Sequence, residues 1–206
     1  MLKLERKYYT KEITAIVGVD EAGRGPLAGP VYAAAVVFPK GYKNKEIDDS
    51  KKLSPKKREE LFEVIKKHAL GYGIASVSAD EIDRLNIYEA TKVCMKAAIA
   101  QISCSYQLII TDAMPLQGCK TPVVPIIKGD AQCLNVAAAS ILAKVSRDRY
   151  MAELEKQYPN YKFSVHKGYG TALHLQELSQ FGPIPHVHRK TFGPVAAYYD
   201  QQIKLF

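Results

Sequence analysis

The sequence predicts an α/β fold in which a mixed central sheet is flanked by helices. Short apolar runs typical of buried strands come early, and helical patterns rich in Ala, Leu and Lys dominate the second half. The chain has 206 residues, 47% of them hydrophobic and 24% charged, which is an ordinary globular composition. We therefore expect a single domain over residues 1–206, with residues 196–206 as a C-terminal tail.

The first two expected strands are joined by a short segment rich in Gly and Pro. The apolar run Ile13–Val19 reads as a strand that stops at Asp20, and Val31–Phe38 reads as a second buried strand that Pro39 and Gly41 close. A short connection of this kind favours an antiparallel pair.

A helix is expected next. Ser54 is suited to the N-cap and Pro55 to the first helical position, so the helix would run to about Ala69. A third strand, a short helix and a longer helix then follow at Tyr72–Val77, Ala79–Leu85 and Tyr88–Ser103.

The second half of the chain contains two more strand patterns and then only helices. Gln107–Thr111 is a strand that delivers Asp112 at its C-terminal end, and the prolines around Val123–Ile127 indicate an edge strand. Gln132–Tyr158 is the strongest helical pattern, which Pro159 ends. Two further helices are expected at Thr171–Phe181 and Pro194–Lys204.

Four acidic residues follow predicted strands: Asp20, Glu21, Asp112 and Asp130. Loops beyond strand ends are where α/β folds bind ligands, so these acids are candidates for one site. Converging carboxylates repel one another unless a cation joins them, and oxygen-only ligation favours Mg²⁺ or Mn²⁺. Two such ions suit phosphodiester hydrolysis. The alternative is that these acids only cap helices and turns.

Two details of the segment around Asp20 and Glu21 cannot be decided from the sequence. Neighbouring residues of a regular strand point to opposite faces, so Asp20 and Glu21 can share a site only if the chain bends; the glycines after them indicate such a bend. The stretch of residues 20–31 fits neither the phosphate-binding pattern GxxxxGK[ST] nor GxGxxG. It forms either a tight hairpin or a turn whose backbone can approach a sugar or phosphate.

The chain carries a formal net charge of +8, which favours a polyanionic partner such as nucleic acid. The candidate phosphate contacts, which could equally be solvated surface residues, are Lys51, Lys52, Lys144, Arg147, Arg149 and the cluster His188–Lys190. The pair His186 and His188 could suggest zinc, but no third ligand is near.

Other classes of protein are disfavoured. The longest apolar runs, Leu27–Phe38 and Val136–Val145, are too short to span a bilayer, and the N-terminus lacks the apolar core of a signal peptide. The four cysteines form no CxxC pair, so we expect them reduced and mostly buried. We expect a cytoplasmic protein with no membrane association.

Seven sequence blocks resemble those of bacterial ribonuclease HII, the type 2 ribonucleases H, in the order of that family. They are DEAGRGPLAGPV (20–31), DDSKKLSPKKRE (48–59), TDAMP (111–115), KGDA (128–131), AAASILAKVSRDR (137–149), HKGYGT (166–171) and HRKTFGPV (188–195). The resemblance covers residues 13–195. The sister type, ribonuclease HIII, usually has an additional N-terminal domain, for which we expect no room here, and a different glycine motif.

The resemblance implies a ribonuclease H-like fold and an endonuclease that cleaves RNA in RNA–DNA hybrids and incises 5′ to single ribonucleotides in duplex DNA. The products would carry 3′-hydroxyl and 5′-phosphate ends. The catalytic and metal-binding acids of the family map onto Asp20, Glu21, Asp112 and Asp130. Its residues that sense the ribose 2′-hydroxyl map onto Gly23–Gly25, which includes Arg24, and Tyr169.

Two other functions stay open at this point. A junction resolvase would use the same acids without the 2′-hydroxyl sensor, and a non-catalytic hybrid-binding module would have lost at least one acid. At the C-terminus, Gln202–Phe206 reads QIKLF and resembles the pentapeptides with which bacterial proteins bind the DNA sliding clamp; the alternative is that Leu205 and Phe206 pack against the body. We expect a monomer.

Overall fold

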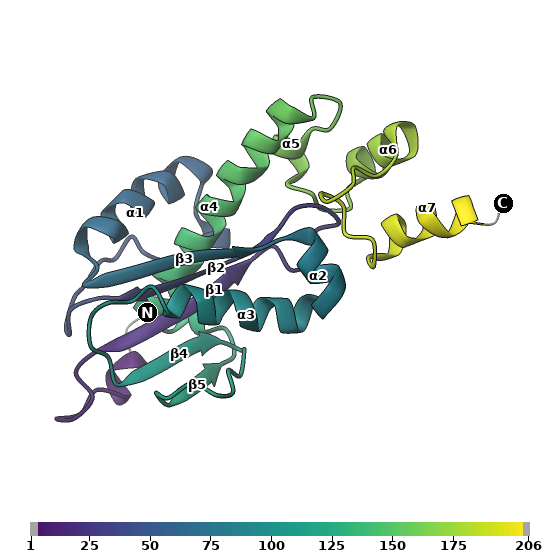
Figure 1. The fold of residues 1–206 in the computed structure, drawn as a ribbon. Helices are drawn as coiled ribbons and strands as arrows, with labels where there is room; N and C mark the ends of the chain where they lie inside the picture. The colour runs from purple at the N-terminus through teal and green to yellow at the C-terminus, as the bar shows by residue number, and fades with distance from the viewer. Residues whose placement is uncertain (1–3, 204–206) are drawn as a thin grey trace.

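A five-stranded mixed sheet forms the centre of the computed structural model, which describes residues 4–203 (Figure 1). The strand order is β3-β2-β1-β4-β5. The strands are β1 (Ile16–Ala22), β2 (Val31–Val37), β3 (Gly71–Val77), β4 (Leu108–Asp112) and β5 (Val123–Ile126). The predicted antiparallel pairing of β1 with β2 is confirmed, and β5 lies at an edge as its prolines indicated. Because β4 runs parallel to β1, both strands end at the same edge of the sheet.

Helices cover both faces of this sheet (Figure 1). Alternating residues of β1 and β2 pack on opposite sides: Val17 and Val19 join the core under α3 (Ile87–Ile99), whereas Ala34 and Val36 join the core under α4 (Leu134–Gln157). Two further helices, α1 (Pro55–His68) and α2 (Ala79–Leu85), lie beside α4 and α3 respectively. The predicted α/β class with helices flanking the sheet is therefore confirmed.

The C-terminal helical part consists of α5 (Phe163–His166), α6 (Ala172–Phe181) and α7 (Gly193–Ile203), which extends away from the sheet in Figure 1. The sequence did not predict α5, because four residues are too few to show a helical period. Three single-turn 3₁₀ helices, Glu5–Lys7, Ser50–Lys52 and Gly129–Ala131, were also not predicted. The helix expected to reach Ser103 ends at Ile99.

Backbone hydrogen bonds attach the C-terminal part to the segment between β1 and β2. Leu27 N–H donates to the carbonyl of Gly168 at 2.7 Å, and Gly29 N–H donates to that of Val187 at 2.8 Å. Arg189 N–H returns to the carbonyl of Leu27 at 2.8 Å. The glycine-rich turn is thus sandwiched by residues far away in the sequence.

Three further observations bear on the sequence analysis. None of the described helices has the length and apolarity needed to cross a membrane. Cys94 and Cys133 are buried, but Cys104 and Cys119 are only half-buried, and all four are free thiols. Of the predicted clamp motif, residues 204–206 lie outside the described part of the chain.

Candidate active site

Three carboxylates meet at the edge of the sheet where β1 and β4 end. Asp20 lies in β1, Asp112 is the last residue of β4, and Asp130 lies in the 3₁₀ turn that follows β5. Each offers an oxygen atom within 4.8 Å of those of the other two. The parallel pairing of β1 with β4 produces this convergence, because it brings the C-terminal ends of both strands together.

Local hydrogen bonds fix these side chains. The N–H of Glu21 donates to Oδ1 of Asp20 at 2.7 Å, and the N–H of Gly129 donates to Oδ1 of Asp112 at 2.9 Å. The second bond connects the 3₁₀ turn carrying Asp130 to the end of β4. The ammonium group of Lys51 lies 3.7 Å from Oδ2 of Asp130.

The electrostatics of the site disfavour its fully ionised state. Burial raises the pKa of Asp20 well above its usual value, and the neighbouring charges of Glu21 and Asp112 raise it further. Burial also raises the pKa of Asp112, although the N–H of Gly129 opposes this shift. The ammonium group of Lys51 does not offset the burial and mutual repulsion of these carboxylates, and a cation bound among them would stabilise their ionised forms.

Glu21 lines the same pocket but is not part of the group of three. The strand stays regular through Ala22, with Glu21 paired to Ala33, so the predicted bend begins only at Gly23. Glu21 consequently points to the other face of the sheet from Asp20. Its Oε2 is buried without a hydrogen-bond partner, and its Oε1 accepts a long bond of 3.4 Å from Arg24. Burial raises its pKa.

The glycine turn and Tyr169 form the neighbouring wall of this pocket of about 210 Å³. Gly23 has a φ of 97°, and a Cβ at this position would overlap Nε of Arg147, so only glycine fits. A Cβ on Gly25 would lie 3.7 Å from the ring of Tyr169, at ordinary contact distance. Tyr169 is 43% exposed. The two parts of the predicted 2′-hydroxyl sensor therefore lie next to each other and next to the acids.

Two arginines that the sequence suggested as phosphate contacts are instead buried behind the turn. Arg147 is 1% exposed and Arg189 0%. Arg147 donates to the carbonyls of Ala28, Pro30 and Lys167 at 3.0–3.1 Å. Arg189 donates to those of Gly23, Arg24 and Gly29 at 2.7–2.9 Å. The prediction was wrong for both, because guanidinium groups have five donors that can satisfy converging backbone carbonyls.

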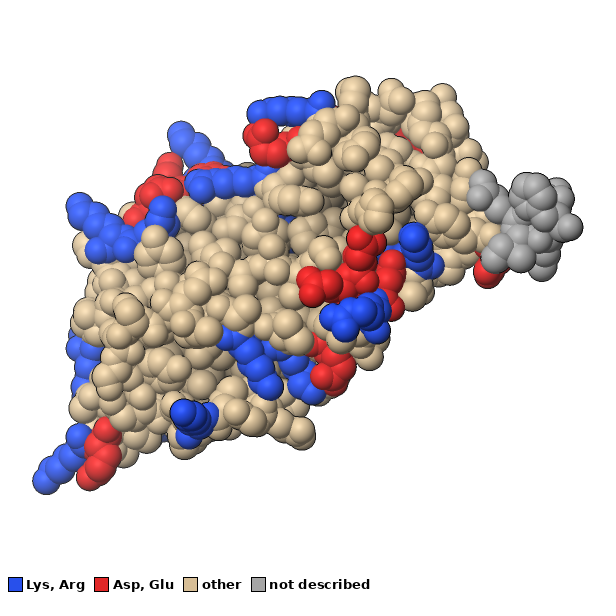
Figure 2. All heavy atoms as spheres, in the orientation of Figure 1, with Lys and Arg blue, Asp and Glu red and all other residues tan. Residues whose placement is uncertain are grey.

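Of the other basic candidates, Lys52 pairs with Asp48 at 3.4 Å, and the ammonium group of Lys190 lies over the ring of Tyr199. Lys51 and Lys144 line the pocket of the acids, and Lys144 pairs with Asp148 at 2.8 Å. Arg149 lies elsewhere, in an ion pair with Glu59. On the face shown in Figure 2, lysines and arginines are separated by uncharged surface and mixed with acidic groups, so the positive charge does not gather there.

The HxH pair does not form a site. His186 is exposed and bonds to Asp80, at 2.7 Å, whereas His188 is buried among other aromatic rings.

Sequence reasoning missed two serines and an arginine in this pocket. The hydroxyls of Ser50 and Ser140 lie 2.9 Å apart, and the Ser140 hydroxyl lowers the pKa of Asp20 against the larger effect of burial. Arg58 donates to the carbonyls of Ser50 and Leu53, at 2.9 and 2.6 Å. A signal for Ser140 was present, because it is a polar residue within an Ala-rich apolar run of the strongest helix.

The comparisons with known proteins assign the chain to a family. The family model described as Ribonuclease HII matches residues 17–195. The chain belongs to the ribonuclease HII family. Ribonuclease HII of Acholeplasma laidlawii is 50% identical over 200 residues, covering 97% of this chain and 98% of that protein. The resemblance is thus confirmed, and the chain is a type 2 ribonuclease H, an endonuclease.

Solved structures agree with this assignment. Ribonuclease H2 from Pyrococcus horikoshii is 27% identical, with a TM-score of 0.78 over 92% of this chain and 99% of that one. Archaeoglobus fulgidus RNase HII, solved in a complex with PCNA, is 27% identical, with a TM-score of 0.70 over 85% and 92%. The ribonuclease H-like fold is therefore confirmed. Membership of the ribonuclease HII family also argues against a junction resolvase.

Proposed function

We propose that this ribonuclease HII hydrolyses the RNA strand of RNA–DNA hybrids and incises 5′ to single ribonucleotides in duplex DNA. The products carry 3′-hydroxyl and 5′-phosphate ends. The observation that carries this proposal is the pocket in which the acidic group lies beside the Gly23–Gly25 turn and Tyr169. Such a pocket combines groups suited to phosphodiester hydrolysis with groups that can contact a ribose. A non-catalytic hybrid-binding module would not need the acids.

The residues of the site fit divalent metal ions. Asp20, Asp112 and Asp130 offer only oxygen, which Mg²⁺ and Mn²⁺ prefer, and their oxygens are close enough to share an ion. The buried Oε2 of Glu21 has no protein partner, as expected for a further ligand. When bound, such ions activate water and stabilise the leaving oxygen of an in-line displacement. We propose these four acids as the catalytic and metal-binding set.

The other residues of the pocket position the substrate. Gly25 is exposed and carries no side chain, so the backbone of the turn can approach a sugar there, and Tyr169 can pack beside the same sugar. The 2′-hydroxyl is the group that distinguishes RNA from DNA, so a contact with it gives the required selectivity. Lys51 and Lys144, on the border of the pocket, are suited to backbone phosphates.

The test uses a DNA duplex that contains one ribonucleotide, with Mg²⁺ or Mn²⁺, and maps the cut at nucleotide resolution. We expect incision on the 5′ side of the ribonucleotide and none in an all-DNA duplex. Asp20→Asn should reduce the rate at least about a thousandfold, because it removes a charge that both metal roles use. Asp80→Asn, an exposed acid that pairs with His186, is the matched control. Near-normal rates for Asp20→Asn, or in excess chelator, would refute the metal assignment.

A second test concerns Tyr169. Tyr169→Ala should impair cutting at a single ribonucleotide more than cutting of a long hybrid, because a long hybrid offers many alternative registers. An equal loss on both substrates would make Tyr169 a general substrate contact and would refute its role as a sensor.

We also propose that the C-terminal residues Gln202–Phe206 bind the DNA sliding clamp. Two apolar anchors preceded by a glutamine suit such docking, and the A. fulgidus RNase HII was solved in complex with PCNA. Tethering would raise the effective concentration of the enzyme at newly made DNA. Deletion of residues 202–206 should abolish clamp binding and leave the melting temperature unchanged. A lowered melting temperature with no clamp binding by the intact chain would show that the tail is structural.

A further inference from the structure

Two buried histidines connect the C-terminal part to the backbone of Tyr169. Nε2 of His174 lies 3.1 Å from Nε2 of His188, and Nδ1 of His174 lies 3.0 Å from the carbonyl oxygen of Tyr169. At the far end, the N–H of Ile184 donates to Nδ1 of His188 at 2.9 Å. We call His174 and His188 the histidine relay.

The two ends of the relay decide where its protons lie. A backbone N–H can only donate, so Nδ1 of His188 accepts and the ring proton of His188 lies on Nε2. Nε2 of His174 therefore accepts that proton, and the ring proton of His174 lies on Nδ1. A backbone carbonyl can only accept, so Nδ1–H of His174 donates to Tyr169. All three hydrogen bonds, from Ile184 through His188 and His174 to Tyr169, therefore run in the same donor-to-acceptor direction, and both imidazole rings are neutral.

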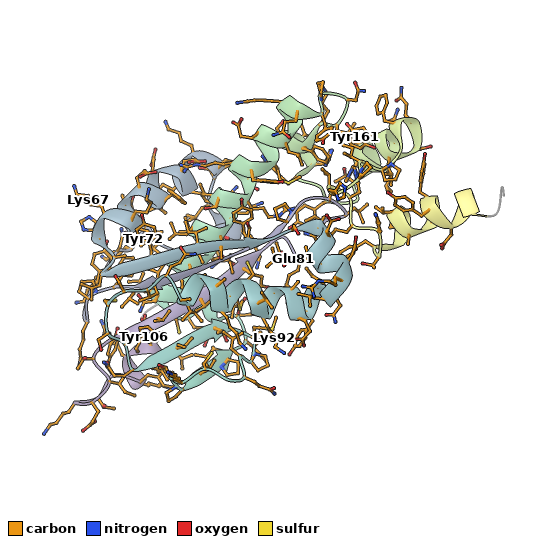
Figure 3. The ribbon with its side chains drawn as sticks, in the orientation of Figure 1. Lys67, Tyr72, Glu81, Lys92, Tyr106 and Tyr161 are labelled. Carbon is orange, nitrogen blue, oxygen red and sulfur yellow. The ribbon has the colours of Figure 1, made fainter. Side chains whose placement is uncertain are left out.

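The surroundings keep the relay neutral and rigid. His174 is 0% exposed and His188 1%, and both rings pack against Tyr161, which Figure 3 labels in the C-terminal part. Burial lowers the pKa of His174 to about 4 and that of His188 to about 3. His166 stacks on His174 with ring centroids 4.1 Å apart, and its own Nδ1 accepts from Gly168 N–H.

The loop before Tyr169 needs such support. Lys167 and Gly168 both have positive φ angles, of 53° and 80°, so two consecutive residues adopt a conformation that L side chains rarely take. Tyr169 is 43% exposed, so much of its side chain faces solvent, and the guanidinium of Arg147 lies 5.9 Å from the centroid of its ring. The direction of this ring therefore depends on the backbone to which it is attached.

We propose that His174 and His188 are positioning residues that, together with the N–H of Thr171, which donates to the same oxygen at 2.8 Å, fix the peptide carbonyl of Tyr169 and thereby aim its ring at the substrate sugar over Gly25. This inference rests on the proposed sensor function of Tyr169. Neither histidine lines the pocket of the acids, so both act only through Tyr169.

A matched pair of variants at His174 tests the relay. The side-chain amide of Asn reaches the position of Nδ1, so His174→Asn keeps a donor for the Tyr169 carbonyl. The longer Gln places its amide near Nε2, so His174→Gln keeps the contact to His188 and loses that donor. We expect the selectivity ratio, which is kcat/KM for a single ribonucleotide divided by kcat/KM for a long hybrid, to stay near the wild-type value in His174→Asn. His174→Gln should lower it about tenfold or more, mainly through kcat, because misplaced contacts cost rate. A purely structural role predicts equal effects of both variants on this ratio.

Two further measurements separate the outcomes. The selectivity ratio of Tyr169→Ala is measured in parallel. If Tyr169→Ala leaves this ratio unchanged, the sensor function of Tyr169 is refuted. If Tyr169→Ala lowers the ratio but His174→Asn and His174→Gln have equal ratios, only the histidine relay is refuted. Should either His174 variant fail to fold, ¹H–¹⁵N correlations of the imidazoles in the wild-type protein decide. We expect the proton on Nδ1 of His174 and on Nε2 of His188, with the exposed His68 and His186 as internal references. The opposite tautomers would overturn the proposal.

Discussion

Replacing either glycine of the Gly23–Gly25 turn with alanine adds the same methyl group but should have opposite consequences. At Gly23 the φ of 97° and the overlap with Arg147 forbid a Cβ. At Gly25 the backbone is not in the positive-φ region, and the ring of Tyr169 lies at ordinary contact distance. Gly23→Ala should therefore destabilise the fold, whereas Gly25→Ala should affect only recognition of the substrate.

The size of the difference follows from the contacts. An alanine held at the φ of Gly23 costs about 1–2 kcal/mol. Displacing Arg147 breaks at least one hydrogen bond from a charged donor to a buried carbonyl, which costs about 1.5–3 kcal/mol. At about 2–4 °C per kcal/mol for a chain of this size, the melting temperature of Gly23→Ala should fall by about 5–20 °C. Gly25→Ala should stay within about 0.5 kcal/mol of the wild type.

Scanning calorimetry and the incision assay together check this pair. Gly25→Ala should have the same melting temperature as the wild type. It should cut at a single ribonucleotide at least about tenfold more slowly, since its methyl group occupies the space between the turn and Tyr169. Equal melting temperatures for the two variants would contradict the view that Arg147 closes the space above Gly23. Normal incision by Gly25→Ala would show that the substrate does not approach this turn.

Three other outcomes are expected. In chelator, Asp20→Asn should melt at a higher temperature than the wild type, because it removes a buried charge next to Glu21 and Asp112, and Mg²⁺ should stabilise only the wild type; calorimetry with and without metal tests both points. The unfolded chain protonates its histidines near the usual pKa of 6.5, whereas the folded chain protonates His174 only at a pKa of about 4 and His188 only at about 3. As the pH falls through this range, the free energy of unfolding should therefore fall by about 1.4 kcal/mol per pH unit for each ring. Urea titrations across this range would contradict the prediction by showing a flat profile. Affinity for a hybrid should fall steeply with salt, as expected if about 4–6 phosphates are contacted, and a salt-independent affinity would exclude a basic contact surface.

The sheet and its acids could be predicted from the sequence because local signals mark them. Each strand is an apolar run that ends in a polar or glycine-rich segment. The strand therefore fixes the position of the residue at that boundary, such as Asp112. Parallel pairing then brings such boundaries together without any further information. The sequence predicted that Asp20 and Asp112 follow strands, and the parallel pairing of β1 with β4 that brings them together is a finding of the structure.

The bonds behind the turn could not be predicted in this way. Arginine is a residue type that usually lies at the surface. The burial of Arg147 depends on the carbonyls of Ala28, Pro30 and Lys167, which belong to two segments distant from it in the sequence. Histidines such as His174 give no periodic signal, and their partners are set by tertiary contacts. The opposite directions of Asp20 and Glu21 followed from strand geometry, but the point where the strand stops depended on Gly23.

The bonds from Arg189 to the carbonyls of Gly23 and Arg24 span 166 and 165 positions of the sequence, and this separation has a consequence for biosynthesis. A ribosome makes all four acids by residue 130, and N-terminal parts of a chain can begin to fold during synthesis. The turn beside the acids is secured only after residue 189 has left the exit tunnel. We therefore expect a nascent chain to contain all four carboxylates well before the turn beside them is held in place, so that the complete pocket forms only after residue 189 has emerged.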